Sequence, residues 1–251
     1  MGVGMTTDEQ PSVLLVDDTP GEAANFAAAF DRLTHVRTME QLDAAVAGNR
    51  PFDIAFVDFN LGSADYTGLT ALARLRRRRP GCRVVSYSQL AESGRTLYAC
   101  AARHWFAADA LLDKVHNHAE TLRRYADQLA GGANPTPIGW QRRLEHAGLI
   151  DDIVAEPYWV QIWRALHESA GEMQAAARLL GRDAAQLRGF KDRAMAAVVE
   201  FNRVIHDIEP PLVQRNKKGV LSTFAARHWQ FLGAPDLTTA MAADVRVRSP
   251  R

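Results

Sequence analysis

Apolar residues in the first half of the chain form short continuous runs that alternate with amphipathic segments of helix length. Residues 12–16 (SVLLV) and 53–57 (DIAFV) are almost wholly apolar, as expected of strands buried on both faces of a parallel sheet. Weaker strand candidates are residues 35–38, 83–87 and 110–112, and helical spacing is found in residues 22–32, 39–47, 69–79, 95–102 and 115–130. This βαβ alternation predicts an α/β domain with a doubly wound, five-stranded parallel sheet.

The pattern changes after residue 137. Residues 157–168, 172–180 and 184–208 carry apolar side chains at helical spacing, which predicts an all-α domain. The two halves are separated by GGANPTP, in which paired glycines end a helix and two prolines prevent its continuation. We therefore expect a flexible N-terminus over 1–11, an α/β domain over 12–130, a linker over 131–137 and an all-α domain over 138–251.

The composition is that of an ordinary globular protein. With 47% hydrophobic and 24% charged residues, a collagenous or largely disordered chain is excluded. No uncharged apolar run approaches the roughly 18 residues of a membrane span, and MGVGMTTDEQ lacks the blocks of a signal peptide. The only cysteines, Cys82 and Cys100, form no CxxC pair, which argues against a disulfide framework or a cysteine metal site. We expect a cytoplasmic protein without membrane contact.

Acidic side chains directly follow two of the predicted strands. Asp17 and Asp18 come after VLLV, and Asp58 comes after IAFV. In a doubly wound sheet the carboxyl ends of the strands meet in one crevice, where ligands bind. Carboxylates that close repel one another unless a cation lies among them, and oxygen ligands suit Mg²⁺. We expect Asp17, Asp18 and Asp58 to bind this metal while one carboxylate stays free to attack phosphorus.

Two further side chains complete this chemistry. Ser88 ends the RVVSYS run and offers a hydroxyl, and Lys114 follows ALLD and offers an ammonium group. Together with the metal they would neutralise the oxygens of a phosphoryl group on Asp58. Ser86 is a rival to Ser88, because a strand register shifted by two residues keeps the same side chains facing the crevice.

With these residues in this order, residues 12–130 resemble the receiver domain of two-component response regulators. The resemblance implies that Asp17 and Asp18 help to bind Mg²⁺, that Asp58 accepts the phosphoryl group, and that Ser88 and Lys114 contact it. Gly68 resembles the glycine that opens the third helix of the family, about two positions later than usual. The implied fold is flavodoxin-like, and the implied phosphodonor is a sensor histidine kinase.

The segment also departs from the family pattern at three positions. Val115 replaces the usual proline after the lysine, so we expect no cis peptide there. Leu111 stands where many receivers carry Tyr or Phe, which argues against signalling through that ring. Gln89 follows Ser88 where a small residue is usual, and we expect its bulk to slow phosphoryl transfer. Extra residues are expected around positions 91–95.

Residues 173–193 (MQAAARLLGRDAAQLRGFKDR) resemble a helix-turn-helix. Ala177 and Gly181 would allow a close crossing and a tight turn, with Leu187 and Phe190 in the core behind them. The outward face would present Arg182, Gln186, Arg188, Lys191 and Arg193, side chains suited to base edges and phosphates. Residues 135–251 carry a net charge of +3, from 16 Lys/Arg and 13 Asp/Glu, which is modest for a DNA-binding domain.

The resulting hypothesis is a homodimeric response regulator of a phosphorelay. Phosphorylation would shift a two-state equilibrium of the receiver and alter dimerisation or domain docking. Its output domain would bind duplex DNA to regulate transcription. The alternative is a signalling adaptor whose helical domain binds a protein. We expect no enzymatic activity beyond slow self-dephosphorylation, because no nucleophile, base and oxyanion constellation is apparent beyond residue 134.

Overall fold

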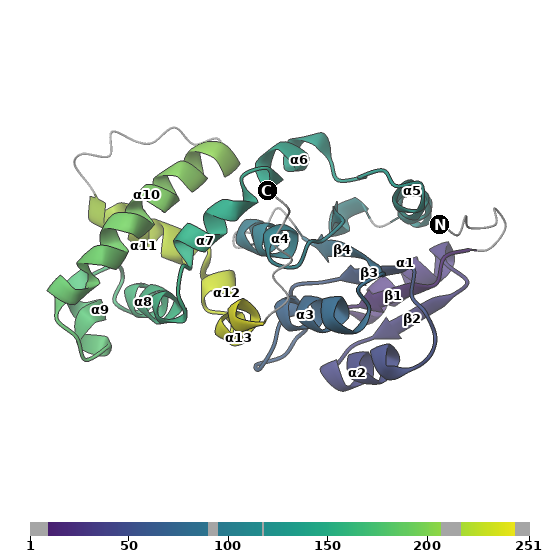
Figure 1. Cartoon of the computed structure of the whole chain (residues 1–251), viewed down its shortest axis with the longest axis horizontal. Coiled ribbons are helices and arrows are strands. Elements are labelled where there is room, and N and C mark those ends of the chain that lie inside the picture. Colours follow the sequence, from purple (N-terminus) through teal and green to yellow (C-terminus); the bar gives the residue numbers. More distant parts are fainter. Residues whose placement is uncertain (1–9, 90–94, 117, 207–216, 244–251) are drawn as a thin grey trace.

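The structure, a computed structural model, describes residues 10–89, 95–116, 118–206 and 217–243 (Figure 1). Its single described sheet has five parallel strands in the order β2-β1-β3-β4-β5. They are β1 (Val13–Val16), β2 (Leu33–Val36), β3 (Ile54–Val57), β4 (Arg83–Ser88) and β5 (Ala110–Asp113). The order of the strands reverses at β1, because β2 lies on one side of it and β3 to β5 lie on the other. At such a reversal a crevice forms beyond the carboxyl ends of the two adjacent strands, here β1 and β3. The predicted doubly wound sheet is confirmed.

Five helices cover the two faces of this sheet. They are α1 (Pro20–Ala29), α2 (Met39–Ala47), α3 (Gly68–Arg78), α4 (Arg95–His104) and α5 (Ala119–Ala130). Side chains of alternate strand residues, such as Leu15 and Phe56, form one buried cluster with α1 and α5. Their neighbours, such as Leu14 and Ala55, form a second cluster with α2, α3 and α4. Burial on both faces explains why these strands appear as continuous apolar runs.

The regular structure described after residue 137 is entirely helical, as predicted. It comprises α6 (Ile138–Leu144), η2 (Ala147–Leu149), α7 (Ile150–Ile153), α8 (Pro157–Glu168), α9 (Met173–Leu179), η3 (Ala184–Leu187), α10 (Arg188–Ile205), α11 (Lys217–Arg227), α12 (Trp229–Leu232) and α13 (Leu237–Ala242). No helix within the described ranges is long and apolar enough to cross a membrane.

The helical region packs against the α3 and α4 side of the sheet (Figure 1). One hydrophobic cluster runs from Leu97 of α4 and from Trp105, which follows that helix, to Ile150, Trp163 and Phe231 of the helical region. The segment between the two halves is also anchored, because the hydroxyl of Thr136 accepts a hydrogen bond at 2.9 Å from the backbone N–H of Leu111 in β5. β5 is an edge strand, and this bond satisfies one of its exposed backbone groups.

Several predicted boundaries need correction. The strand expected at residues 35–38 lies at Leu33–Val36, because Thr38 instead caps α2 by accepting a hydrogen bond from the N–H of Gln41. The helix expected at 22–32 spans Pro20–Ala29, and the one expected at 115–130 begins at Ala119 after a 3-10 turn, η1 (Lys114–His116). The helices expected at 39–47 and 157–168 match α2 and α8. Residues 1–9 and 90–94, part of the expected N-terminal segment and insertion, lie outside the described residues.

Candidate functional site

Three carboxylates meet beyond the carboxyl ends of β1 and β3. Asp17 and Asp18 directly follow β1, and Asp58 directly follows β3. One oxygen atom from each lies within 4.8 Å of the other two. Asp17 and Asp58 are buried, whereas Asp18 is partly exposed. The structure thus brings together the acidic residues that the sequence predicted at this edge of the sheet.

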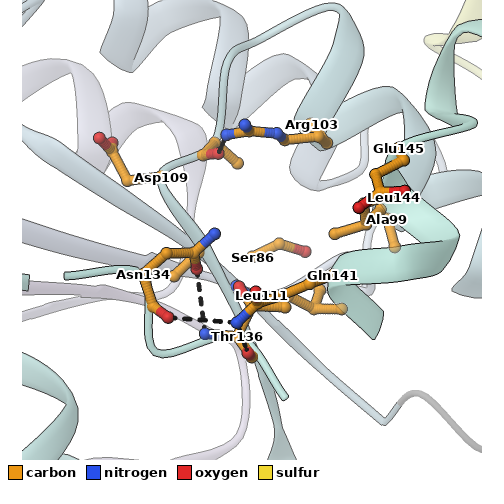
Figure 2. Close-up of a pocket in the computed structure, with 12 residues that line it drawn as sticks. Ser86, Ala99, Arg103, Asp109, Leu111, Asn134, Thr136, Gln141, Leu144 and Glu145 are labelled. Carbon is orange, nitrogen blue, oxygen red and sulfur yellow. Dashed lines mark hydrogen bonds between the residues drawn. The ribbon is translucent and has the colours of Figure 1, made fainter. Parts of the chain in front are cut away.

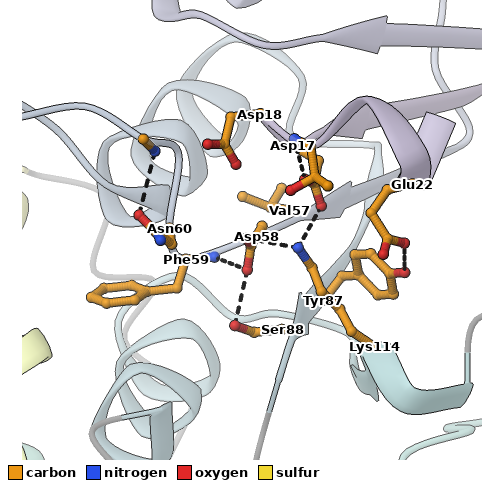
Figure 3. Close-up of polar contacts among 12 residues, drawn as sticks. Asp17, Asp18, Glu22, Val57, Asp58, Phe59, Asn60, Tyr87, Ser88 and Lys114 are labelled. Atoms are coloured by element: carbon orange, nitrogen blue, oxygen red, sulfur yellow. Dashed lines mark hydrogen bonds and ion pairs between the residues drawn. The ribbon is translucent and has the colours of Figure 1, made fainter. Parts of the chain in front are cut away.

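Asp58 is held by three donors (Figure 3). Its Oδ1 accepts hydrogen bonds from the backbone N–H of Phe59 at 2.7 Å and from the hydroxyl of Ser88 at 2.9 Å. Its Oδ2 lies 2.8 Å from Nζ of Lys114, and the same Nζ lies 2.7 Å from Oδ2 of Asp17. One ammonium group therefore bridges two buried carboxylates. Ser88 and Lys114 both reach the position that the sequence predicted for them.

The charges of this cluster are strongly coupled. Burial raises the pKa of the Asp58 carboxyl above its ordinary value, and the nearby Lys114 opposes that rise. Burial alone would lower the pKa of Lys114, but the adjacent Asp58 and Asp17 carboxylates outweigh it and raise that pKa. Lys114 is therefore protonated at neutral pH, and its single ammonium group serves both Asp17 and Asp58.

The donor set fits a hard divalent cation. All three candidate ligands are carboxylate oxygens, which suit Mg²⁺ or Ca²⁺ and not a thiophilic metal. The partly exposed Asp18 leaves the cluster accessible from solvent. The triad is consistent with the metal site of a receiver domain.

Ser86, the rival to Ser88, faces a different part of the molecule. It lines a cavity of about 210 Å³ between α4, β5 and the segment that leads into α6. Figure 2 shows its side chain among Arg103, Asn134 and Glu145. Ser86 lies two residues before Ser88 in β4 and is paired with Val57 of the neighbouring strand β3. The hydrogen bond to Asp58 comes from Ser88.

Gly68, which opens α3, is required by the packing around Asp58. A Cβ atom at this position would overlap the backbone carbonyl oxygen of Asp58. The N–H of Gly68 also donates to the carbonyl of Phe59 at 2.8 Å. The segment that carries Asp58 is therefore folded tightly against the start of α3. The sequence alone did not predict this contact, because Gly68 stands about two positions later than the glycine of the family pattern.

The departures from the family pattern have clear structural counterparts. No cis peptide bond occurs among the described residues, so the bond from Lys114 to Val115 is trans, as expected. Leu111 is buried in β5 and presents no aromatic ring there. Gln89 is exposed directly after β4, and its expected effect on phosphoryl transfer stays a prediction.

The predicted helix-turn-helix differs from expectation in its second helix. The helix expected from residue 184 begins as the 3-10 turn η3, and α10 starts only at Arg188. A capping box marks the start of this turn: Asp183 accepts from the N–H of Ala185 while Gln186 accepts from the N–H of Asp183. A 3-10 first turn is common at helix termini. Gly181 takes the left-handed conformation (φ 63°) that the expected tight turn requires.

The five predicted DNA-contacting residues are distributed around this segment. Arg182, Gln186, Arg188 and Arg193 are exposed, and Lys191 is partly buried. Three of them already make contacts within the chain. Gln186 belongs to the capping box, and the guanidinium groups of Arg182 and Arg193 lie 6.0 and 5.0 Å from the ring centroids of Tyr158 and Trp159. Behind them, Leu187 and Phe190 are buried as expected. Ala176 and Ala177 are also buried, and Leu180 is partly buried.

Sheet order, helix placement and the acidic cluster together define the receiver fold of response regulators, followed by a helical C-terminal region. No protein-family profile matches the sequence, and no curated protein matches it. The fold is similar to that of the RcsB response regulator from Salmonella typhimurium, with a TM-score of 0.52 and 15% identity over 85% of this chain and 98% of RcsB.

Two other solved structures are less similar. The response regulator DrrB, a Thermotoga maritima OmpR/PhoB homolog, gives a TM-score of 0.39 with 19% identity over 50% of this chain, and the match spans 55% of DrrB. A response regulator from Burkholderia pseudomallei, solved with a phosphorylated aspartic acid, a calcium ion and citrate, gives a TM-score of 0.36 with 21% identity over 74% of this chain and 96% of that chain.

Proposed function

We propose that this protein is a response regulator that accepts a phosphoryl group on Asp58. The observation that carries the proposal is the contact set of Asp58, whose two oxygens meet a hydroxyl, an ammonium group and a backbone N–H beside two further carboxylates. This arrangement offers a nucleophile together with donors that can stabilise the oxygens of a phosphoryl group.

In this proposal a carboxylate oxygen of Asp58 forms a bond to phosphorus while the bond from phosphorus to the donor's leaving group breaks. Mg²⁺ held by Asp17, Asp18 and Asp58 would supply charge neutralisation for the incoming phosphate. Lys114 stays beside the reacting carboxylate and binds a phosphoryl oxygen. The hydroxyl of Ser88 donates a hydrogen bond to Asp58 in the unphosphorylated protein. After phosphorylation it would turn to donate to the phosphoryl group.

The donor that we propose is the phosphohistidine of a sensor histidine kinase, in the cytoplasm. The protein itself acts as a phosphoacceptor, with no catalysis beyond slow loss of its own phosphate. Phosphorylation then controls the helical region, either through formation of a homodimer or through its docking on the receiver fold.

For the output we propose binding of duplex DNA through the segment from α9 to α10. The proposal is supported by the left-handed Gly181 between the helices and by the exposed side chains of Arg188 and Arg193. The similar RcsB structure is described in terms of DNA interaction. A protein-binding adaptor is the second candidate, favoured by Leu179, an apolar residue of α9 that is 58% exposed beside the same segment.

The phosphoacceptor is tested by incubating the wild-type protein and Asp58→Asn with a small phosphodonor and Mg²⁺ and weighing the intact proteins. We expect one phosphoryl group on the wild type and none on the variant, and we expect chelation of the metal to abolish uptake because the carboxylates then repel the phosphate. Equal uptake by both proteins would refute the assignment.

The output is tested by measuring binding of the full-length protein to duplex DNA at several salt concentrations, with and without phosphodonor. A DNA-binding regulator loses affinity steeply as salt rises, because bound cationic side chains release counterions from the phosphates. Absence of binding at low salt in both states would favour the adaptor.

A further inference from the structure

Asp236 belongs to the helical region, yet its carboxylate is buried against the receiver fold. It lies between α12 and α13, and only 5% of its surface is exposed. Its Oδ2 accepts hydrogen bonds from the N–H of Thr67 and from the hydroxyl of Thr70, both at 2.7 Å. Its Oδ1 accepts from the hydroxyl of Thr67 at 2.9 Å. Thr67 is the N-cap of α3, so a carboxylate from the helical region stabilises the N-terminus of this helix.

The residues that Asp236 contacts adjoin the phosphoacceptor. Thr67 precedes Gly68, whose N–H donates to the carbonyl of Phe59 and whose Cα lies against the backbone of Asp58. At the other end of the same segment, the ring of Phe59 lies 6.4 Å from that of Phe231 in α12. Both ends of residues 58–68 therefore touch α12 and α13. Figure 1 shows α12 and α13 beside α4 and α3.

The carboxylate of Asp236 is buried at this interface among neutral donors. Its carboxylate makes no ion pair within the described part of the chain, and its hydrogen bonds come from neutral threonine groups. Asp236 and Asp58 both act on the hydroxyl of Tyr98, on which the positive charge of Arg95 also acts. Burial raises the pKa of the Tyr98 hydroxyl well above its ordinary value, and the charges of both Asp58 and Asp236 contribute to that rise.

We propose that Asp236 is a positioning residue through which the helical region restrains the segment that carries Asp58, and that phosphorylation of Asp58 and docking of α12–α13 oppose each other. The inference rests on the proposed function of Asp58. It adds a specific contact, from Asp236 to Thr67 and Thr70, that is separate from the hydrogen bond between Ser88 and Asp58.

The direction of the coupling follows from charge. With a divalent cation bound and Lys114 protonated, the three carboxylates of the site are balanced, and a phosphoryl group adds one negative charge. This charge repels the buried Asp236 in a region of low dielectric constant. Because coupling between two equilibria is reciprocal, weakening the Asp236 contact should favour phosphorylation, and phosphorylation should weaken the contact.

The first test compares phosphoryl uptake by the full-length wild type, Asp236→Asn and Asp151→Asn. Asparagine keeps the shape of the side chain and one acceptor oxygen but removes the charge. Asp151 is a matched control, because it joins the helical region to α4 through His104 at 2.9 Å and Trp105 at 2.7 Å and does not contact residues 58–68. We expect weaker docking in Asp236→Asn to raise the population of the state that reacts and, with it, the limiting uptake rate by about fivefold. The donor concentration for half-maximal rate should stay unchanged, and Asp151→Asn should match the wild type.

The second test needs no variant. Hydrogen exchange of the wild-type protein is compared before and after phosphorylation, and we expect faster exchange in α12 and α13 but not in α10, which packs within the helical region. An uptake rate of Asp236→Asn equal to that of Asp151→Asn, or unchanged exchange in α12 and α13, would overturn the inference. Uptake that persists in Asp58→Asn would instead overturn the proposed function, and the inference with it.

Discussion

Acid should destabilise this protein through two histidines of the helical region. His228 is fully buried beside the rings of Phe201 and Phe224, and its Nε2 lies 3.3 Å from Nε2 of His206. Burial, together with the positive charge of Arg227 nearby, lowers the pKa of His228 to about 3 and that of His206 to about 4. Both imidazoles are neutral in the folded protein at neutral pH.

The size of the effect depends mainly on the unfolded chain, in which each histidine binds a proton near its ordinary pKa of 6.5. Because the folded pKa values are depressed, the stability that the neutral imidazoles contribute is complete above pH 6.5 and is lost as pH falls toward 4. At pH 5 the fully buried His228 would cost about 2 kcal/mol of unfolding free energy, at roughly 1.4 kcal/mol per pH unit below 6.5, and the partly exposed His206 would cost less.

The assay is urea unfolding of the wild type and His228→Leu at pH 8 and pH 5. We expect the loss of unfolding free energy between these pH values to be about 2 kcal/mol smaller in the variant, because one of the two protonations no longer contributes. His118→Gln, at an exposed position, should behave as the wild type does. An equal pH dependence in the wild type and His228→Leu would refute this reasoning.

Three further predictions concern the site and the output. Lys114→Met should lower the unfolding free energy by about 3–5 kcal/mol in the absence of divalent cations, since it leaves buried carboxylates unpaired; denaturant titration with and without Mg²⁺ measures this. Gly68→Ala should unfold at clearly lower denaturant than the wild type, because its Cβ would overlap the backbone of Asp58. Arg188→Ala should cost roughly 1–3 kcal/mol of DNA-binding free energy and relax the preference for one base position. Lys191→Ala should instead weaken binding to all DNA sequences alike and reduce the salt dependence of the affinity by about one unit of slope. Binding of both variants to selected oligonucleotides distinguishes these outcomes.

The sheet and the acidic cluster were predictable because their signals are local. Strands buried on both faces appear as apolar runs, and a carboxylate that follows such a run must lie at the carboxyl end of the sheet. β2 was misplaced because three of its four residues are only partly buried, so its sequence carries no such run. The start of α10 was misplaced because the first turn of the expected helix is a 3-10 turn, and apolar spacing does not distinguish such a turn from the first turn of an α-helix.

The contacts between the two halves could not be predicted from the sequence. Asp236 and Thr67 are separated by 169 positions, and neither residue belongs to a pattern that identifies a partner. An aspartate in a helical region is normally exposed to solvent, so its burial follows only from the packing of α12 and α13 on the receiver fold. The same holds for Phe231, whose apolar side chain fits any helical core.

The central claim is that Asp58 carries the phosphoryl group, and the most direct measurement is to locate that group on the chain. The protein is incubated with a small phosphodonor and Mg²⁺, the acyl phosphate is reduced with borohydride to a stable alcohol, and the modified residue is identified by peptide mass spectrometry. We predict modification at Asp58 alone, lost when the metal is chelated. Modification at Asp17, at Asp18 or at a residue outside the acidic cluster, with Asp58 unmodified, would contradict the account.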